Sequence, residues 1–189
     1  RERIRAAEVR NLRRDQLLIE RELRILHRVV GRRKNRIDLL GNQRIDRCID
    51  LIVRRAGLSG EIEVASAATT NDEAGNDTYY ATKDVLTEKG IPFTPRRAVK
   101  MTKDDYNTYD YIIVFDEENI RGVERITGLH DAEKVYTLLT FAGEDRDIAD
   151  PWYTRDFQQT YRDVEAGCNE LLHCLLEANP DLADKAAKN

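Results

Sequence analysis

Apolar residues in the first thirty positions fall on one stripe of a predicted helix. They recur at steps of seven, four, three and four, a spacing typical of one helix face. The stripe consists of Leu12, Ile19, Leu23, Leu26 and Val30. The pattern predicts a long helix over residues 2–30, which Gly31 and the basic residues after it interrupt. An apolar stripe on an otherwise charged helix favours packing against another surface, so self-association through this helix is one hypothesis.

From residue 57 onward, strand-like and helix-like segments alternate. Residues 61–69, 111–115 and 134–139 have the pattern of strands, and the second is a continuous apolar run, as expected of a strand buried on both faces. Residues 79–89 and 119–127 carry helical spacing. A last helix carries an apolar stripe made of Phe157, Tyr161, Val164, Cys168, Leu171 and Leu175. This alternation predicts an α/β fold with a parallel sheet, and it makes Cys168 a core residue.

The charge of the chain changes sign near residue 56. Residues 1–55 hold 17 Lys and Arg against 8 Asp and Glu, whereas residues 56–189 hold 14 against 27. We interpret residues 1–40 as a basic helical extension, residues 41–180 as one domain and residues 181–189 as a flexible tail. Clustered arginines can contact phosphates. The interleaved acidic residues and the lack of aromatic residues nevertheless favour a solvated, salt-bridged helix face over nucleic-acid binding.

Composition narrows the class of protein further. The chain has 189 residues, 35% of them charged, and no window approaches the ~20 apolar residues that span a bilayer. We therefore expect no membrane association and a cytoplasmic location. The three cysteines are odd in number and match no metal-binding spacing, which is typical of free thiols in a reducing compartment. We expect neither a metal nor another cofactor.

Six segments carry a family resemblance in their order along the chain. They read GLSGEIEVASAATT, KGIPFTPRRAVKMT, YDYIIVFDEENIR, KVYTLLTF, DIADPWY and YRDVEAGCNELLHCLL. Together they resemble the low-molecular-weight protein tyrosine phosphatase family, over residues 56–177. The resemblance implies a three-layer α/β/α fold with a parallel sheet of about four strands. It also implies hydrolysis of phosphotyrosine monoesters, in proteins or as small aryl phosphates, through a cysteinyl-phosphate intermediate.

The same resemblance assigns roles to four residues. It makes Asp150 the general acid that protonates the leaving phenolate oxygen. It places Trp152 and Tyr153 on the rim of the active site, where they stack against the aromatic phosphoester. It places Ser66 beside the phosphate-binding loop, where it supports the conformation of the loop. Taken alone, an Asp-Pro pair followed by two aromatic residues is also typical of an ordinary turn with packing side chains.

The family's nucleophile loop, C-x-G-N-x-C-R-S, does not occur in the chain. Residues 39–44 keep its Leu-Gly-Asn and an arginine, with a leucine in place of the nucleophile. Residues 24–31 imitate the first strand and the loop glycine, with Val29 in the cysteine position. Cys48 and Arg54 satisfy the bare C-x5-R spacing, but they lie in a segment with helical periodicity. A helix would separate two such residues by ~9 Å and ~240°, too far to enclose one phosphate.

Loss of this loop raises a question about the sheet. In the family, the strand before the loop occupies the middle of the sheet, and its loss would leave unpaired edges. Residues 24–30 or 36–40 could fill the slot, but they would carry Arg28, Arg36 or Asp38 into the interior. This conflict favours the interpretation that residues 1 to about 52 are not native to the domain.

Two functions therefore stay open. The chain is a phosphotyrosine phosphatase with Asp150 as general acid and an altered nucleophile loop, or it is an inactive relative that binds phosphorylated ligands or partners through the surviving rim. A cysteine in a phosphate-sized binding loop within reach of Asp150 would decide for the phosphatase function.

Overall fold

The computed structural model describes residues 35–40, 46–72, 74–95, 97–130 and 133–188. Its elements, in chain order, are β1 (Asn35–Leu40), α2 (Asp46–Arg55), β2 (Ile62–Ala67), α3 (Tyr80–Glu88), α4 (Lys103–Thr108), β3 (Tyr111–Val114), α5 (Glu117–Thr127), β4 (Val135–Thr137), α6 (Leu138–Phe141), α7 (Pro151–Thr154), α8 (Phe157–Ala178) and α9 (Pro180–Ala186). The predicted helix over residues 2–30 lies outside the described residues. None of the described helices is long and apolar enough to cross a membrane.

The four strands form one parallel sheet in the order β2-β1-β3-β4. The prediction of an α/β fold with parallel strands is therefore confirmed. β1 occupies an inner position and pairs with both β2 and β3, so the slot in the sheet is filled by residues 35–40. Residues 36–40 were one of the two candidate segments for this slot, and backbone pairing with strands on both sides holds them there although they include Arg36 and Asp38. The sheet thus includes residues that the predicted division at residue 40 assigns to the extension.

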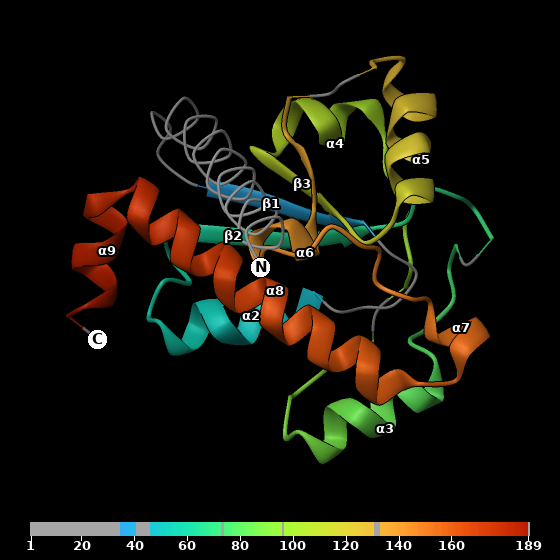
Figure 1. Ribbon diagram of the computed structural model, residues 1–189, viewed down its shortest axis with the longest axis horizontal. Coiled ribbons are helices and arrows are strands. Elements are labelled where there is room, and N and C mark those ends of the chain that lie inside the picture. The colour runs from blue at the N-terminus through green and yellow to red at the C-terminus, as the bar shows by residue number, and fades with distance from the viewer. Residues whose placement is uncertain (1–34, 41–45, 73, 96, 131–132, 189) are drawn as a thin grey trace, which may run out of the picture.

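β3 shows how the two faces of the sheet are covered. Tyr111 and Ile113 belong to one buried apolar cluster, which includes residues of α2 and α8. Ile112 belongs to a second cluster, together with Val123 of α5. Because successive side chains of a strand point to opposite faces, helices cover both faces of the sheet. Figure 1 shows α2 and α8 on one side and α4 and α5 on the other.

Local signals fix the ends of the helices. Asp116 precedes α5 and accepts a hydrogen bond from the backbone N–H of Asn119 at 2.7 Å. Asp156 caps α8 in the same way, through the N–H of Gln159 at 2.8 Å. Gly128 ends α5 with a φ of 73°, a conformation that glycine adopts without strain. Two of the helices predicted from periodicity, α5 and α8, thus begin at capping residues that the sequence already contains.

The last residues of the chain differ from the predicted flexible tail. Residues 180–186 form α9, which begins with Pro180 after the capping residue Asn179. Leu182 is buried in the main core, and Lys185 forms an ion pair with Glu61 at 2.8 Å. The buried leucine, the N-cap and the ion pair together hold this short helix against the domain.

Candidate functional site

The carboxyl ends of the parallel strands form one edge of the sheet. β1 lies between β2 and β3, so the chain leaves β1 toward β2 on one side and reaches β3 on the other. Such a switch point is where open parallel sheets bind their ligands. Five residues, Gly41 to Ile45, connect β1 to α2 and lie outside the described residues, as does the Gly-Asn remnant among them. Because this connection is short, the N-terminus of α2 lies at the same edge.

Residues 144–150 bring Asp150 to this edge. The backbone N–H of Ile148 donates to the carbonyl of Phe115, directly after β3, at 2.9 Å. Asp150 then caps α7, where its Oδ1 accepts from the backbone N–H of Trp152 at 2.8 Å, and Pro151 starts the helix. The DPW sequence is therefore a helix start as well as a turn. It holds the Asp150 carboxylate in a fixed position beside the end of β3.

A second carboxylate, Asp116, lies in the same region. Partial burial raises its pKa, and the negative charges of Asp147 and Asp150 raise it further. The hydrogen bond that it accepts from Asn119 acts in the opposite direction. The site edge is thus acidic, and Asp116 holds its proton more strongly than an ordinary aspartate.

Aromatic side chains border Asp150 on its outer side. Trp152 and Tyr153 are 49% and 84% exposed. The Tyr79 ring lies 5.2 Å from Trp152 in an edge-on contact and 5.8 Å from Phe157 in a stacked one. Arg155 lies 5.0 Å above the Trp152 ring, within the range of a cation–π contact. These contacts pack against Trp152 and still leave about half of its surface, and most of Tyr153, exposed to solvent.

Sequence reasoning missed the contribution of the Tyr79–Tyr80 pair. It treated Tyr79 only as the start of a helix, although α3 begins at Tyr80, which is 66% exposed. The two rings lie 4.5 Å apart. The two adjacent tyrosines are far in sequence from the DPWY segment. They can be recognised as part of an aromatic rim only once the fold has brought them next to that segment.

Ser66 lies on β2, where it is half-buried and pairs in register with Leu39 of β1. It therefore lies one residue before the end of β2, next to the strand that leads into residues 41–45. Its role as a support for that loop stays a prediction, since the loop itself is not described.

The structure separates Cys48 from Arg54. Both are on α2, as the periodicity predicts. Cys48 is in the first turn, and its side chain is 4% exposed within the core cluster. Arg54 is near the other end of the helix, is solvent-exposed, and forms an ion pair with Asp50 at 3.0 Å. A regular helix thus keeps the two groups on different sides, and they do not enclose a phosphate in this conformation.

The other two cysteines are on α8. Cys168 is fully buried, and burial is the main cause that raises the pKa of its thiol; the nearby Cys48 adds to the effect. Burial also raises the pKa of the half-buried Cys174. A raised pKa disfavours the thiolate, which is the nucleophilic form. Cys168 is a core residue, as predicted.

The arrangement offers a carboxylate at a helix N-terminus, an accessible aromatic rim and the start of α2 at one edge of the sheet. A carboxylic acid can donate a proton to a departing oxygen, and exposed rings can stack on an aryl group. No group of His, Cys, Asp and Glu within the described ranges is arranged to hold a metal ion.

Comparison with known proteins gives a consistent picture. The family model for low molecular weight phosphotyrosine protein phosphatase matches residues 46–181. The low molecular weight protein-tyrosine-phosphatase YfkJ of Bacillus subtilis is 32% identical over 124 residues, which cover 64% of this chain and 79% of that protein. The low molecular weight phosphotyrosine protein phosphatase of Gallus gallus is 32% identical over 114 residues, covering 58% and 72% of the two proteins.

Solved structures show the same similarity. The crystal structure of YfkJ superposes with a TM-score of 0.72 at 27% identity, covering 78% of this chain and 98% of that one. The low molecular weight protein tyrosine phosphatase of Streptococcus pyogenes gives a TM-score of 0.64 at 28% identity, covering 75% and 92%.

Proposed function

Because the chain belongs to the low molecular weight phosphotyrosine protein phosphatase family, we propose that the carboxyl edge of its sheet binds phosphotyrosine monoesters and that Asp150 is the proton donor for their hydrolysis. The ligand is a phosphotyrosine side chain of a protein or a small aryl phosphate. The observation that carries the proposal is the position of Asp150, which is fixed at the start of α7 between the end of β3 and the exposed Trp152 and Tyr153.

Asp150 suits the step in which the bond between phosphorus and the phenolic oxygen breaks. As phosphorus leaves the phenolic oxygen, negative charge builds on that oxygen, and a carboxylic acid within hydrogen-bond reach neutralises it by giving up its proton. The rings of Trp152 and Tyr153 would hold the aryl group of the ester by stacking, so that its oxygen faces the acid. The backbone N–H groups at the N-terminus of α2 face the same edge and favour an anion there.

Hydrolysis by the family's route also needs a cysteine thiolate. The thiolate attacks phosphorus, the aryl oxygen leaves with the proton of Asp150, and water then hydrolyses the cysteinyl phosphate. Of the chain's three cysteines, Cys48 is nearest to the edge, since it lies in the first turn of α2. It would have to leave the core to reach a bound phosphate, and Arg54 would have to leave Asp50. In this version of the function, the first turn of α2 opens.

A second function follows from the positions of the cysteines. Cys48 and Cys168 are buried in the core, and Cys174 lies on α8 with a raised pKa. This arrangement favours a relative that binds phosphorylated ligands or partners through the rim and does not form a cysteinyl phosphate. Both functions share the ligand class and the edge, and they differ only in turnover.

Hydrolysis of para-nitrophenyl phosphate at mildly acidic pH separates the two functions. The purified chain is compared with Cys48→Ser and Asp150→Ala variants, and Cys174→Ser serves as the matched cysteine control. Turnover that Cys48→Ser abolishes and Cys174→Ser leaves intact supports the phosphatase with an opened α2. Absence of turnover above the blank, with retained binding of phenyl phosphate, supports the binding function.

The N-terminal helix predicted over residues 2–30 adds a proposal of its own. Its apolar stripe would join two copies of the chain, and sedimentation equilibrium of the full chain tests this. A monomer at all concentrations would contradict it, and the edge site would be unaffected.

A further inference from the structure

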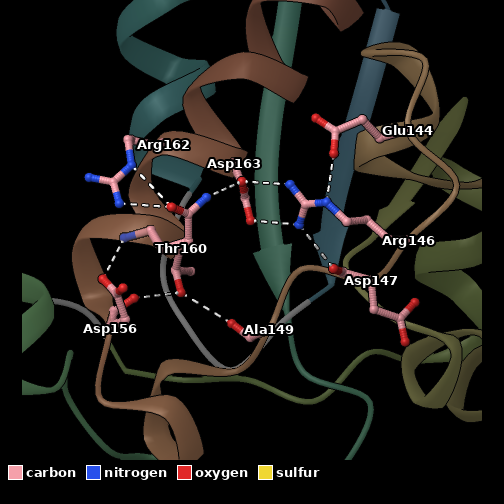
Figure 2. Close-up of polar contacts among 9 residues, drawn as sticks. Glu144, Arg146, Asp147, Ala149, Asp156, Thr160, Arg162 and Asp163 are labelled. Atoms are coloured by element: carbon pink, nitrogen blue, oxygen red, sulfur yellow. Dashed lines mark hydrogen bonds and ion pairs between the residues drawn. The ribbon is translucent and has the colours of Figure 1, made fainter.

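One ion pair ties the segment that carries Asp150 to α8. We propose that Arg146 and Thr160 are positioning residues for Asp150, because they fix residues 146–149 to the side of α8. The inference rests on the proposed role of Asp150 and adds residues that act through it. Figure 2 shows the contacts.

Arg146 grips Asp163 with both terminal nitrogens. Nη1 donates to Oδ2 at 2.9 Å and Nη2 donates to Oδ1 at 2.8 Å. Such a two-point contact between a planar guanidinium and a planar carboxylate fixes direction as well as distance. Nε of Arg146 donates to Glu144 at 2.6 Å, so both ends of the guanidinium are held. The arginine therefore has one orientation relative to α8.

The Asp163 carboxylate is buried at this contact. Its side chain is 7% exposed, and Gln159, one turn earlier on α8, donates a further hydrogen bond to Oδ1 at 2.8 Å. The hydrogen bonds from Arg146 are the main cause that lowers the pKa of Asp163. A buried carboxylate that loses its cation is left uncompensated. Asp163 therefore strongly favours the conformation in which Arg146 reaches it.

A second contact holds the backbone nearer to Asp150. The hydroxyl of Thr160, on the same face of α8, donates to the carbonyl of Ala149 at 3.1 Å. Ala149 directly precedes Asp150. Together with the hydrogen bond from Ile148 to Phe115, these contacts fix the segment at three successive points before the acid.

The arrangement favours a positioning role over general stabilisation alone. The three anchors fall on residues 146, 148 and 149, and the segment then passes directly into α7, whose start is the Asp150 carboxylate. Side chains of one rigid 22-residue helix provide two of the anchors. Small displacements of a catalytic group cost activity, so such support from a rigid element is what an acid requires.

The single tryptophan of the chain allows a direct test. In a full-length chain labelled with ¹⁵N-tryptophan, the only backbone amide signal comes from Trp152, whose N–H donates to Asp150 Oδ1. We compare the wild type with Arg146→Gln and Thr160→Val. The control is Arg125→Gln, which removes an arginine–carboxylate pair of 2.9 Å with Glu118 from the last turn of α5. Far-UV circular dichroism checks the fold, and phenyl phosphate is then added to each sample.

We expect Arg146→Gln and Thr160→Val each to shift the Trp152 amide signal and to speed its hydrogen exchange roughly tenfold, the factor that corresponds to loss of a hydrogen bond to a charged group. Arg125→Gln should match the wild type. Arg146→Lys, which keeps the charge and loses the fork, should give an intermediate rate. Folded Arg146→Gln and Thr160→Val variants with the wild-type signal and exchange rate would overturn the inference. A wild type whose indole signal ignores phenyl phosphate, while the variants show the expected amide changes, would refute the proposed function and leave the positioning intact.

Discussion

Gly167 sets how closely α8 approaches α6, and its replacement by alanine should destabilise the fold. A Cβ at this position would lie 2.5 Å from Cγ, 3.0 Å from the carbonyl oxygen and 3.1 Å from Cδ1 of Leu138. Carbon atoms pack best at about 3.5–4.0 Å, so the added atom would overlap by about 1 Å. Leu138 is 0% exposed and cannot move into solvent.

The expected size of the effect follows from two opposing contributions. Overpacking of a buried site costs about 1–3 kcal/mol, and the backbone carbonyl among the contacts favours the upper part of this range. Alanine in a helix interior is about 1 kcal/mol more favourable than glycine. We therefore expect Gly167→Ala to lower the free energy of unfolding by about 1–2 kcal/mol.

Urea denaturation followed by far-UV circular dichroism measures this change. Gly60→Ala is the matched control, because a Cβ at Gly60 would meet nothing within 4 Å. In a Leu138→Ala background, the cost of Gly167→Ala should shrink, since the overlapping side-chain atoms are gone. A Gly167→Ala variant as stable as the wild type, or an unchanged cost in the Leu138→Ala background, would refute the packing argument.

Three further changes test other parts of the structure. Arg155 has a φ of 61°, in the left-handed region that glycine tolerates best. In urea denaturation, Arg155→Gly should therefore be about 1 kcal/mol more stable than Arg155→Ala, and both variants lose the guanidinium over Trp152. Equal stabilities of the two variants would contradict the left-handed conformation. The pKa of Asp116 is raised in the folded state, so ionisation of this carboxyl costs stability. The wild type should therefore lose stability relative to Asp116→Asn as the pH rises from below the ordinary pKa of about 3.9 through the raised pKa of the folded protein. A gain over that window would show that the carboxylate is stabilised. Leu182→Ala should lower the free energy of unfolding by about 2 kcal/mol because Leu182 is buried. Asp181→Ala should lower it much less, because Asp181 is exposed. Equal effects would mean that α9 does not pack on the domain.

The sequence predicts those elements whose pattern and burial agree. Residues 111–114 form an apolar run because both faces of β3 are covered, so the run itself indicates the strand. The stripe on α8 placed Cys168 in the core for the same reason. Helical periodicity around Cys48 correctly indicated α2, and with it the separation from Arg54.

Other features depend on contacts that local pattern does not encode. β1 carries charged residues, so its sequence alone does not mark it as an inner strand; its place is fixed by backbone pairing with two neighbours. Tyr79 joins the rim only because α3 and α7 meet in the fold. Arg146 and Asp163 are 17 positions apart, with the α7 turn between them, so no periodicity links them.

Binding of phenyl phosphate, followed by the fluorescence of the single tryptophan, tests the central claim most directly. Trp152 lies beside Asp150 on the rim, so we expect a ligand at this edge to change its emission. We expect a saturable change that inorganic phosphate reverses by competition. Binding should be weaker in Tyr153→Ala and unchanged in Leu129→Ala, a variant of an exposed apolar residue just after α5. No saturable change at any phenyl phosphate concentration, or equal weakening in both variants, would contradict recognition of aryl phosphates at this edge.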